Sequence, residues 1–377
     1  MKGFKKSVIA LAVSAGLFAF SAADACTDFR LTAKDNSVLV TRSMEFGLDM
    51  KSNVRTSNQG RMFTTTAPDG KPGMSWKEKY GYVFLDGLNQ DMVVDGMNEK
   101  GLSFEALYLP GWAQYQTVPA NKDAAALPYM QIGDWILGNF DSVDQVRAAL
   151  ANTYVFAQTL PGMGSTIFPL HFSIYEANGK GIVVEYVGGK LSIYDNTIGV
   201  MTNSPSYAWQ MTNLTNYINL IPQNPNPVVD SGMTFAATGQ GFGMIGLPGD
   251  ISPPSRFVKI ATLLRVIMQP TDSADALNMA EHVINNVDIP LGLAREPQKN
   301  TVTLEKTEWV VFKDLTHKIL YYRTYGDLSL REVMMSQLNF APNAPRLKMP
   351  IARMETIQNQ TDELLKSKES ITIQQAT

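Results

Sequence analysis

The feature that most constrains this 377-residue chain is its single cysteine, Cys26, which directly follows a segment built like a secretory signal. Residues 1–6 carry three lysines, and residues 7–20 form an uncharged apolar run. Ala23 and Ala25 then supply the small residues of an A-x-A cleavage site. We therefore predict a cleaved signal peptide and an exported protein, periplasmic or secreted. Cleavage after Ala25 leaves a thiol and a free α-amine on the same residue.

A cysteine at this position favours covalent chemistry. An N-terminal amine has a pKa near ~8, so it can take the proton of its own thiol and act as a general base. Lipoprotein processing also places cysteine directly after the signal, but it normally wants leucine at minus three, where this chain has Ala23. A lone cysteine is otherwise most often a small buried hydrophobe. We expect a catalytic nucleophile, with a lipid-anchored periplasmic binding protein as the alternative.

Composition narrows the class of protein. A formal net charge of −3 without a basic block gives no reason to expect nucleic acid as a partner. One cysteine excludes a disulfide within the chain, so the fold depends on its core, for which 45% hydrophobic residues suffice. Beyond the signal we find no apolar run long enough to span a bilayer.

Hydrophobic patterning predicts an α+β protein. Alternation over residues 27–32, a turn at 34–37 and extended character over 38–46 predict a hairpin that starts at Cys26. Further strands are predicted at 81–85, 91–95, 102–107, 171–176, 181–186, 190–194, 198–202, 308–312 and 317–323, and helices at 129–137, 142–151 (with Ser142 as N-cap), 257–268 and 274–287. Because β-α-β alternation is absent, layers with mostly antiparallel sheets are favoured over a parallel fold.

The domain organisation is simple. We find no repeat and no Gly/Ser-rich linker, which predicts a signal peptide over 1–25, a single domain over 26–365 and a polar C-terminal tail over 366–377. The Asn- and Pro-rich stretch at 219–230 reads as a long loop for function or assembly.

Motifs in four regions carry a family resemblance. They are CTDFR at 26–30 with TRSMEF at 41–46, DGMNEKGL at 95–102 with LYLPG at 107–111, MTNSP at 201–205, and GLPGD at 246–250 with SPPSRF at 252–257. Each fragment alone is weak. Together, in order and at similar spacing, they resemble the choloylglycine hydrolase family, the bile salt hydrolases and penicillin V acylases among the N-terminal-nucleophile hydrolases.

The resemblance implies a four-layer αββα sandwich and hydrolysis of a linear carboxamide through a thioester, with no cofactor and no metal. It also implies a homotetramer, because the 219–230 stretch resembles the assembly loop of that family. The positions that match the catalytic motif of the family are Cys26, Arg42, Glu45, Tyr108, Asn203 and Arg256.

Each position has a physical reason to serve such chemistry. Arg42, on the strand next to Cys26, lowers the thiol pKa as a fixed cation. Glu45 lies three residues after Arg42, so the two side chains do not share a face of the strand. Near the end of the strand, Glu45 is expected to turn toward the α-amine. The resemblance assigns the side-chain amide of Asn203 and the backbone N–H of Tyr108 to the oxyanion hole.

Arg256 is the remaining position, and it follows two prolines where a helix is expected to start. The family places an arginine there, near the nucleophile. An arginine in the first turn is unfavourable for the helix dipole, which hints at a role beyond stability.

Two positions depart from parts of the family. Glu45 stands where aspartate is usual, which puts the detail of its amine contact in question. Tyr108 stands where bile salt hydrolases usually carry asparagine and penicillin V acylases often carry tyrosine, which favours a flat aromatic or aliphatic acyl group over a steroid. The expected partner is a small N-acyl amide: penicillin V, a conjugated bile salt or an N-acyl homoserine lactone.

Other chemical signals fail. The G-x-G-x-x-G at 241–246 is followed at once by Pro248, so it opens no helix that could hold a pyrophosphate. His171, His282 and His317 lack metal-ligand spacing. No G-x-S-x-G elbow occurs, which leaves a serine hydrolase unsupported.

Overall fold

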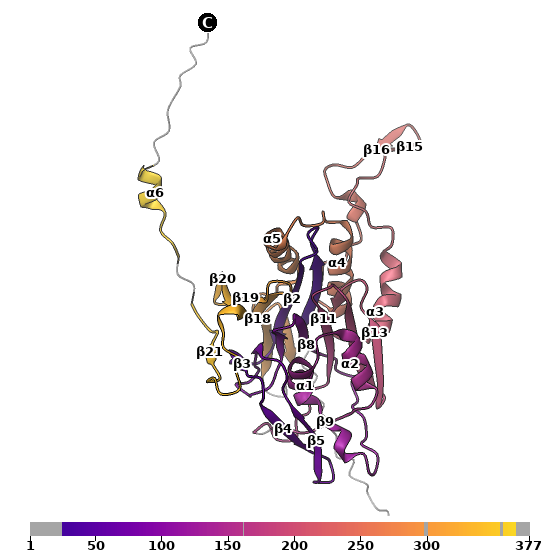
Figure 1. Cartoon of the computed structure of the whole chain (residues 1–377). Coiled ribbons are helices and arrows are strands. Elements are labelled where there is room, and N and C mark those ends of the chain that lie inside the picture. Colours follow the sequence, from indigo (N-terminus) through magenta and orange to yellow (C-terminus); the bar gives the residue numbers. More distant parts are fainter. Residues whose placement is uncertain (1–24, 161, 298–300, 355–356, 367–377) are drawn as a thin grey trace, which may run out of the picture.

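A computed structural model describes residues 25–160, 162–297, 301–354 and 357–366. The chain builds four layers, in which two antiparallel sheets pack face to face between two pairs of helices (Figure 1). This confirms the predicted α+β class and the αββα order. Nearly all of the predicted signal peptide, residues 1–24, and nearly all of the predicted polar tail lie outside the described residues.

The first sheet carries the N-terminal hairpin. Its strand order is β14-β1-β2-β18-β19-β20, with β17 paired to β18. The strands are β1 (Cys26–Thr32), β2 (Val38–Phe46), β14 (Val200–Met201), β17 (Ala294–Pro297), β18 (Val302–Asp314), β19 (Ile319–Thr324) and β20 (Asp327–Met334). The central strands β1 and β2 are buried almost throughout, as expected for strands covered on both faces.

The second sheet runs in the order β13-β12-β11-β8-β7-β6-β3-β21. Its strands are β3 (Asn53–Ser57), β6 (Tyr82–Leu85), β7 (Asp95–Asn98), β8 (Leu102–Tyr108), β11 (Leu170–Glu176), β12 (Gly181–Val187), β13 (Lys190–Asp195) and β21 (Lys348–Pro350). Strands β1 and β8 touch, so the inner faces of the two sheets meet.

Helices cover the outer faces. The pair α4 (Pro253–Val266) and α5 (Ser273–Ile284) packs on the first sheet, and the pair α1 (Ile132–Asn139) and α2 (Val143–Leu150) packs on the second (Figure 1). Buried side chains such as Phe104 and Ile136 fill the space under α1, each contributing ~1.5–3 kcal/mol by leaving water. Within the described residues no helix has the length and apolar character needed to cross a bilayer.

Smaller elements complete the chain. They are the strand pairs β4 (Met62–Thr66) with β5 (Pro72–Lys77), β9 (Ala126–Pro128) with β10 (Tyr154–Phe156) and β15 (Val228–Asp230) with β16 (Met233–Phe235), and the helices α3 (Tyr207–Leu214) and α6 (Thr361–Lys366). The β15–β16 hairpin, which includes part of the predicted 219–230 loop, projects away from the body (Figure 1).

The predicted helices and most predicted strands are present, and Ser142 caps α2 by accepting a hydrogen bond from the Gln145 N–H. The strand predicted at 91–95 is wrong. Residues 91–94 bend, β7 begins only at Asp95, and Asp91 instead pairs with Arg346 and Arg61 at the surface. The consecutive apolar residues Met92, Val93 and Val94 here line a pocket.

Two carboxyl groups and a tyrosine join β6, the segment before it and α1. The Tyr82 hydroxyl lies 2.6 Å from Glu78 Oε1 and 2.7 Å from Asp134 Oδ1. Burial raises the pKa of Glu78 to about 7 and that of Asp134 to about 6. One hydroxyl proton cannot serve two carboxylates, so the cluster is most stable when a carboxyl group is protonated.

This cluster predicts a stability that falls with rising pH. Because the folded pKa of Glu78 exceeds its unfolded value, the folded state binds more protons between about pH 4.5 and 7, and the stabilisation is lost as pH rises through that window. Glu78→Gln removes this proton, so its free energy of unfolding, measured by urea denaturation, falls less between pH 5 and pH 8. The exposed Glu332→Gln serves as control. An equal fall in wild type and Glu78→Gln contradicts the assignment.

Candidate active site

Cys26 begins β1 and pairs with Met44 of β2, in the predicted hairpin. Only 2% of its surface is exposed. In this chain its nitrogen belongs to the peptide bond with Ala25, which is itself buried. The nitrogen is therefore an amide here, at the position that an α-amine takes after cleavage.

Arg42 reaches the thiol from between the two sheets. Its Nη2 lies 3.3 Å from Cys26 Sγ and donates to the Ala106 carbonyl at 2.8 Å. The guanidinium carbon lies 4.8 Å from the centre of the Trp309 ring, and Nη1 lies 3.9 Å from Asp95 Oδ2. Burial raises the pKa of the Cys26 thiol, and Arg42 opposes that rise. The arginine therefore favours the thiolate, as its position in the hairpin predicts.

Arg256 approaches from the opposite, helix-covered side of the sheet. From the first turn of α4 its Nη1 donates to the Cys26 carbonyl and to Thr27 Oγ1, each at 2.5 Å. Its Nη2 donates to Asn203 Oδ1 at 2.8 Å. The side chain thus joins the nucleophile residue to Asn203, which accounts for a cation at an unfavourable end of the helix.

Asn203 follows β14 and contacts both neighbours of the reaction centre. Its Oδ1 accepts from the Cys26 nitrogen at 2.5 Å, and its Nδ2 donates to the Tyr108 carbonyl at 2.8 Å. Its side-chain amide therefore lies beside the nucleophile and beside the strand end that carries Tyr108.

Glu45 lies on the same side of the sheet as Arg256. Its Oε1 accepts from Thr307 Oγ1 at 2.9 Å, and its backbone N–H donates to the Ala25 carbonyl at 2.9 Å. Burial raises the pKa of Glu45 to about 7, against the effect of Arg256. The Cys26 nitrogen donates to Asn203 in this chain, so the predicted contact of the carboxylate with the α-amine stays a prediction.

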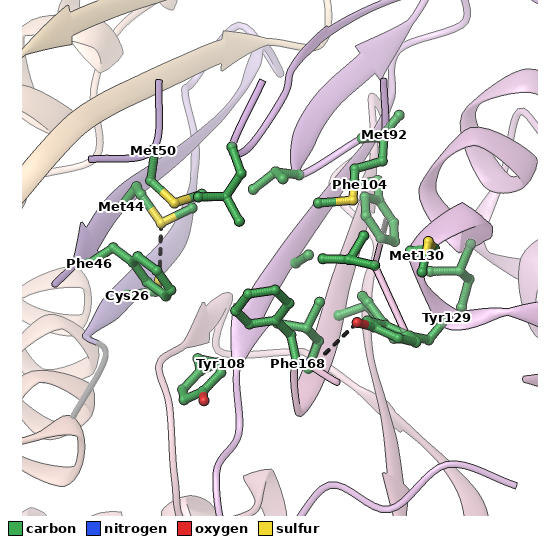
Figure 2. Close-up of a pocket in the computed structure, with 18 of the residues that line it drawn as sticks. Cys26, Met44, Phe46, Met50, Met92, Phe104, Tyr108, Tyr129, Met130 and Phe168 are labelled. Carbon is green, nitrogen blue, oxygen red and sulfur yellow. Dashed lines mark hydrogen bonds between the residues drawn. The ribbon is translucent and has the colours of Figure 1, made fainter. Parts of the chain in front are cut away.

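An apolar pocket opens beside the thiol (Figure 2). Tyr108, Phe46 and Phe168 form one aromatic side, with Phe46 edge-on to Tyr108 at 6.5 Å between ring centres. The lining residues are Cys26, Arg42, Met44, Phe46, Met50, Leu88, Met92, Val93, Val94, Phe104, Ala106, Tyr108, Tyr129, Met130, Ile132, Leu160, Phe168, Leu170 and Phe172. Arg42 is the charged side chain among them, and four of them are methionines.

Sequence reasoning missed several supporting residues. Trp309 and Thr307 come from β18, more than 250 residues after the hairpin. His171, whose spacing in the sequence fits no metal site, lies buried beside Thr202, the residue before Asn203. No local pattern marks these residues, because their partners are set by the stacking of strands.

The structure also describes the excluded motifs. Among the described residues no group of His, Cys, Asp and Glu side chains is arranged to hold a metal ion. The glycine-rich stretch forms a 3₁₀ turn at Phe242–Met244, and α4 begins only at Pro253.

Known proteins resemble this chain in sequence and in fold. Residues 26–350 match the family described as linear amide C–N hydrolases, choloylglycine hydrolase family. A bile salt hydrolase/transferase from Clostridium perfringens is 31% identical over 326 residues, covering 84% of this chain and 94% of that protein. A penicillin V acylase from Pectobacterium atrosepticum is 26% identical over 367 residues, covering 90% of this chain and 89% of that protein.

Solved structures agree with this relationship. A mutant conjugated bile acid hydrolase from Clostridium perfringens superposes with a TM-score of 0.78 at 29% identity, over 89% of this chain and 99% of that one. A penicillin V acylase from Agrobacterium tumefaciens shares the fold, with a TM-score of 0.69 at 23% identity, over 87% of this chain and 94% of that one.

The two-sheet sandwich between helix pairs, with Cys26 at the start of a central strand, is the fold of the N-terminal-nucleophile hydrolase type. The chain belongs to the choloylglycine hydrolase family of linear amide C–N hydrolases.

The geometry predicts that the Asn203 donor can be separated from its acceptor. Asn203→Asp keeps an oxygen for Cys26 N and Arg256 but removes the N–H donor, whereas Asn203→Ala removes both. If the donor stabilises the oxyanion, both variants lose roughly 10²–10³ in kcat for a linear amide substrate. Full kcat in Asn203→Asp, in steady-state assays of folded protein, contradicts the donor role.

Proposed function

We propose that this protein hydrolyses a linear N-acyl amide by using Cys26 as an N-terminal nucleophile. The observation that carries the proposal is the Cys26 thiol, held 3.3 Å from Arg42 at the wall of an apolar pocket. Membership of the family supports the reaction class, since its members act on linear amide C–N bonds.

The proposed reaction has two halves. The thiol proton passes to the α-amine exposed by cleavage, and Sγ attacks the amide carbonyl carbon. The α-ammonium then returns a proton to the leaving nitrogen as the C–N bond breaks, which leaves a thioester on Cys26. Water, activated by the same amine, attacks the thioester and releases the carboxylic acid and the thiol.

The surrounding residues support distinct parts of this cycle. Arg42 stabilises the thiolate. Arg256 fixes the Cys26 carbonyl and Asn203 Oδ1 in place. We assign the oxyanion to Asn203 Nδ2 and the Tyr108 backbone N–H, and we assign Glu45 to orienting the amine once Ala25 is gone. Loss of residue 25 removes the Ala25 carbonyl beside Glu45 and leaves space there for the amine.

The pocket supports an uncharged acyl group. Aromatic side chains and four methionines line it, and methionine adapts to differing apolar shapes. Tyr108, with Phe46 and Phe168, presents flat surfaces for an aromatic or aliphatic chain. We therefore rank phenoxyacetyl (penicillin V) and fatty acyl (N-acyl homoserine lactone) groups above the steroid of a conjugated bile salt.

Export belongs to the same proposal. A signal peptide cut after Ala25 delivers the enzyme to the periplasm or medium and exposes its base in one step. The lipoprotein alternative fits less well, because Cys26 is 2% exposed and its sulfur lies between Arg42 and Met44.

The test is amine release from penicillin V, a conjugated bile salt and an N-acyl homoserine lactone by protein cut before Cys26. We expect release from at least one class, with none in Cys26→Ser or Cys26→Ala although both variants fold. Cleavage of penicillin V without cleavage of bile salt supports the role of Tyr108. Full activity in Cys26→Ala refutes the mechanism, and lipid mass on Cys26 in a membrane fraction supports the alternative.

We also propose assembly as a homotetramer through the β15–β16 hairpin. Its apolar side chains are solvent-exposed in the single chain, with Val229 71% and Phe235 55% exposed. Such a projecting apolar hairpin is typical of an interaction surface.

Substitution of Val229 and Phe235 by aspartate is expected to convert the tetramer to smaller species in light scattering, with an unchanged circular dichroism spectrum. Met62→Asp, at a 65% exposed methionine on β4, is the control and keeps the tetramer. A monomeric wild type, or an unchanged mass in the hairpin variant, contradicts the proposal.

A further inference from the structure

A buried histidine–glutamate pair lies behind the segment that carries Asn203. His171 is 1% exposed and Glu185 is fully buried. The ring Nδ1 of His171 lies 3.0 Å from Glu185 Oε1, and its Nε2 lies 2.8 Å from the Thr202 carbonyl oxygen. A carbonyl oxygen only accepts, so Nε2 carries a hydrogen, and a further proton lies between Nδ1 and the Glu185 carboxyl group.

The pair contacts both ends of the segment 202–207. His171 holds the Thr202 carbonyl, one residue before Asn203, and Glu185 Oε1 also accepts from the Tyr207 N–H at 2.8 Å. Tyr207 is the first residue of α3, so the carboxyl group also lies at the N-terminus of that helix, where negative charge is favoured.

The contacts cross between the two sheets. His171 lies on β11 and Glu185 on β12 of the second sheet, whereas the segment 202–207 directly follows β14 of the first sheet. The pair therefore fixes where the backbone of Asn203 lies relative to β8, whose last residue is Tyr108.

The side chain of Asn203 depends on that placement. Arg256 donates to Asn203 Oδ1 from the helix-covered side, and Asn203 Nδ2 donates to the Tyr108 carbonyl of the second sheet. A backbone shift at Thr202 moves the amide relative to both, and displacement by about an ångström at a reacting group costs up to ~10²-fold in rate.

We propose that His171 and Glu185 are positioning residues that hold Asn203 in place for the acyl-transfer step. This rests on the proposed function, in which Asn203 Nδ2 stabilises the oxyanion. Neither residue lines the pocket beside Cys26, so they act on the reaction through the segment between Thr202 and Tyr207.

Two substitutions of His171 test the contacts of its two ring nitrogens separately. Glutamine places its amide nitrogen near the position of Nε2, so His171→Gln keeps a donor for the Thr202 carbonyl. Asparagine places its amide near Nδ1, so His171→Asn keeps the Glu185 contact and loses that donor. We expect roughly 10- to 100-fold lower kcat in His171→Asn with KM changed less than about threefold, and near wild-type kcat in His171→Gln.

A double-mutant cycle with Asn203→Ala distinguishes positioning from general support of the fold. If His171 acts through Asn203, then His171→Asn lowers kcat in the wild type but causes no further loss, within about twofold, in the Asn203→Ala background. If the effects of the two substitutions multiply, or if His171→Gln is as impaired as His171→Asn, the proposal is overturned.

The remaining outcomes are also decisive. Circular dichroism and melting temperature establish folding, and Glu185→Gln replaces His171→Asn in the same cycle if the latter does not fold. Full kcat in Asn203→Ala refutes the oxyanion assignment and the positioning proposal together, while Cys26-dependent turnover still stands. An impaired Asn203→Ala with additive losses at His171 refutes the positioning proposal alone.

Discussion

Arg42 is a fully buried cation between two packed sheets, and the nucleophile at Cys26 is one of the groups that compensate its charge. An uncompensated buried guanidinium costs several kcal/mol. Here Cys26 Sγ, the Ala106 carbonyl, the Trp309 ring and Asp95 surround it. Burial disfavours the charged form, but the thiol and Asp95 outweigh it and raise the pKa of Arg42. Arg42 in turn stabilises the thiolate form of Cys26, because its positive charge opposes the rise of the thiol pKa.

The compensation extends through the inner layer. Lys313 of β18 contacts Asp95 and lies 2.7 Å from Glu105, and Ser173 links Glu105 to Asp28 on β1. Burial and the neighbouring Glu105 raise the pKa of Asp28 well above its usual value. On the opposite face of the first sheet, Arg256 donates to the Cys26 carbonyl and interacts with the charge of Glu45. The sheet thus separates Arg42, which we propose stabilises the thiolate, from Glu45, which we propose orients the amine.

Local sequence signals predicted the hairpin and the helices, because turns, caps and alternation are encoded within a few residues. The six site positions came from the family resemblance, which no local pattern replaces. The wrong strand at 91–95 shows the limit of such signals. A short apolar run lines a pocket there, and the run alone does not distinguish a pocket wall from a buried strand. The residues that support Arg42 and Asn203 from other strands were not predictable. Lys313 meets Asp95 across 218 residues, and His171 meets Thr202 across 31, through strand stacking that no spacing records.

The central claim is that Cys26 becomes the first residue and carries the acyl group. The most direct measurement is mass spectrometry of the mature protein, acid-quenched during turnover of an N-acyl substrate and then digested. The account predicts an N-terminal peptide that begins at Cys26 and gains the mass of the acyl group less one hydrogen, labile to hydroxylamine as a thioester. Full turnover by a protein whose chain begins upstream of Cys26, or an acyl adduct on another residue, contradicts it.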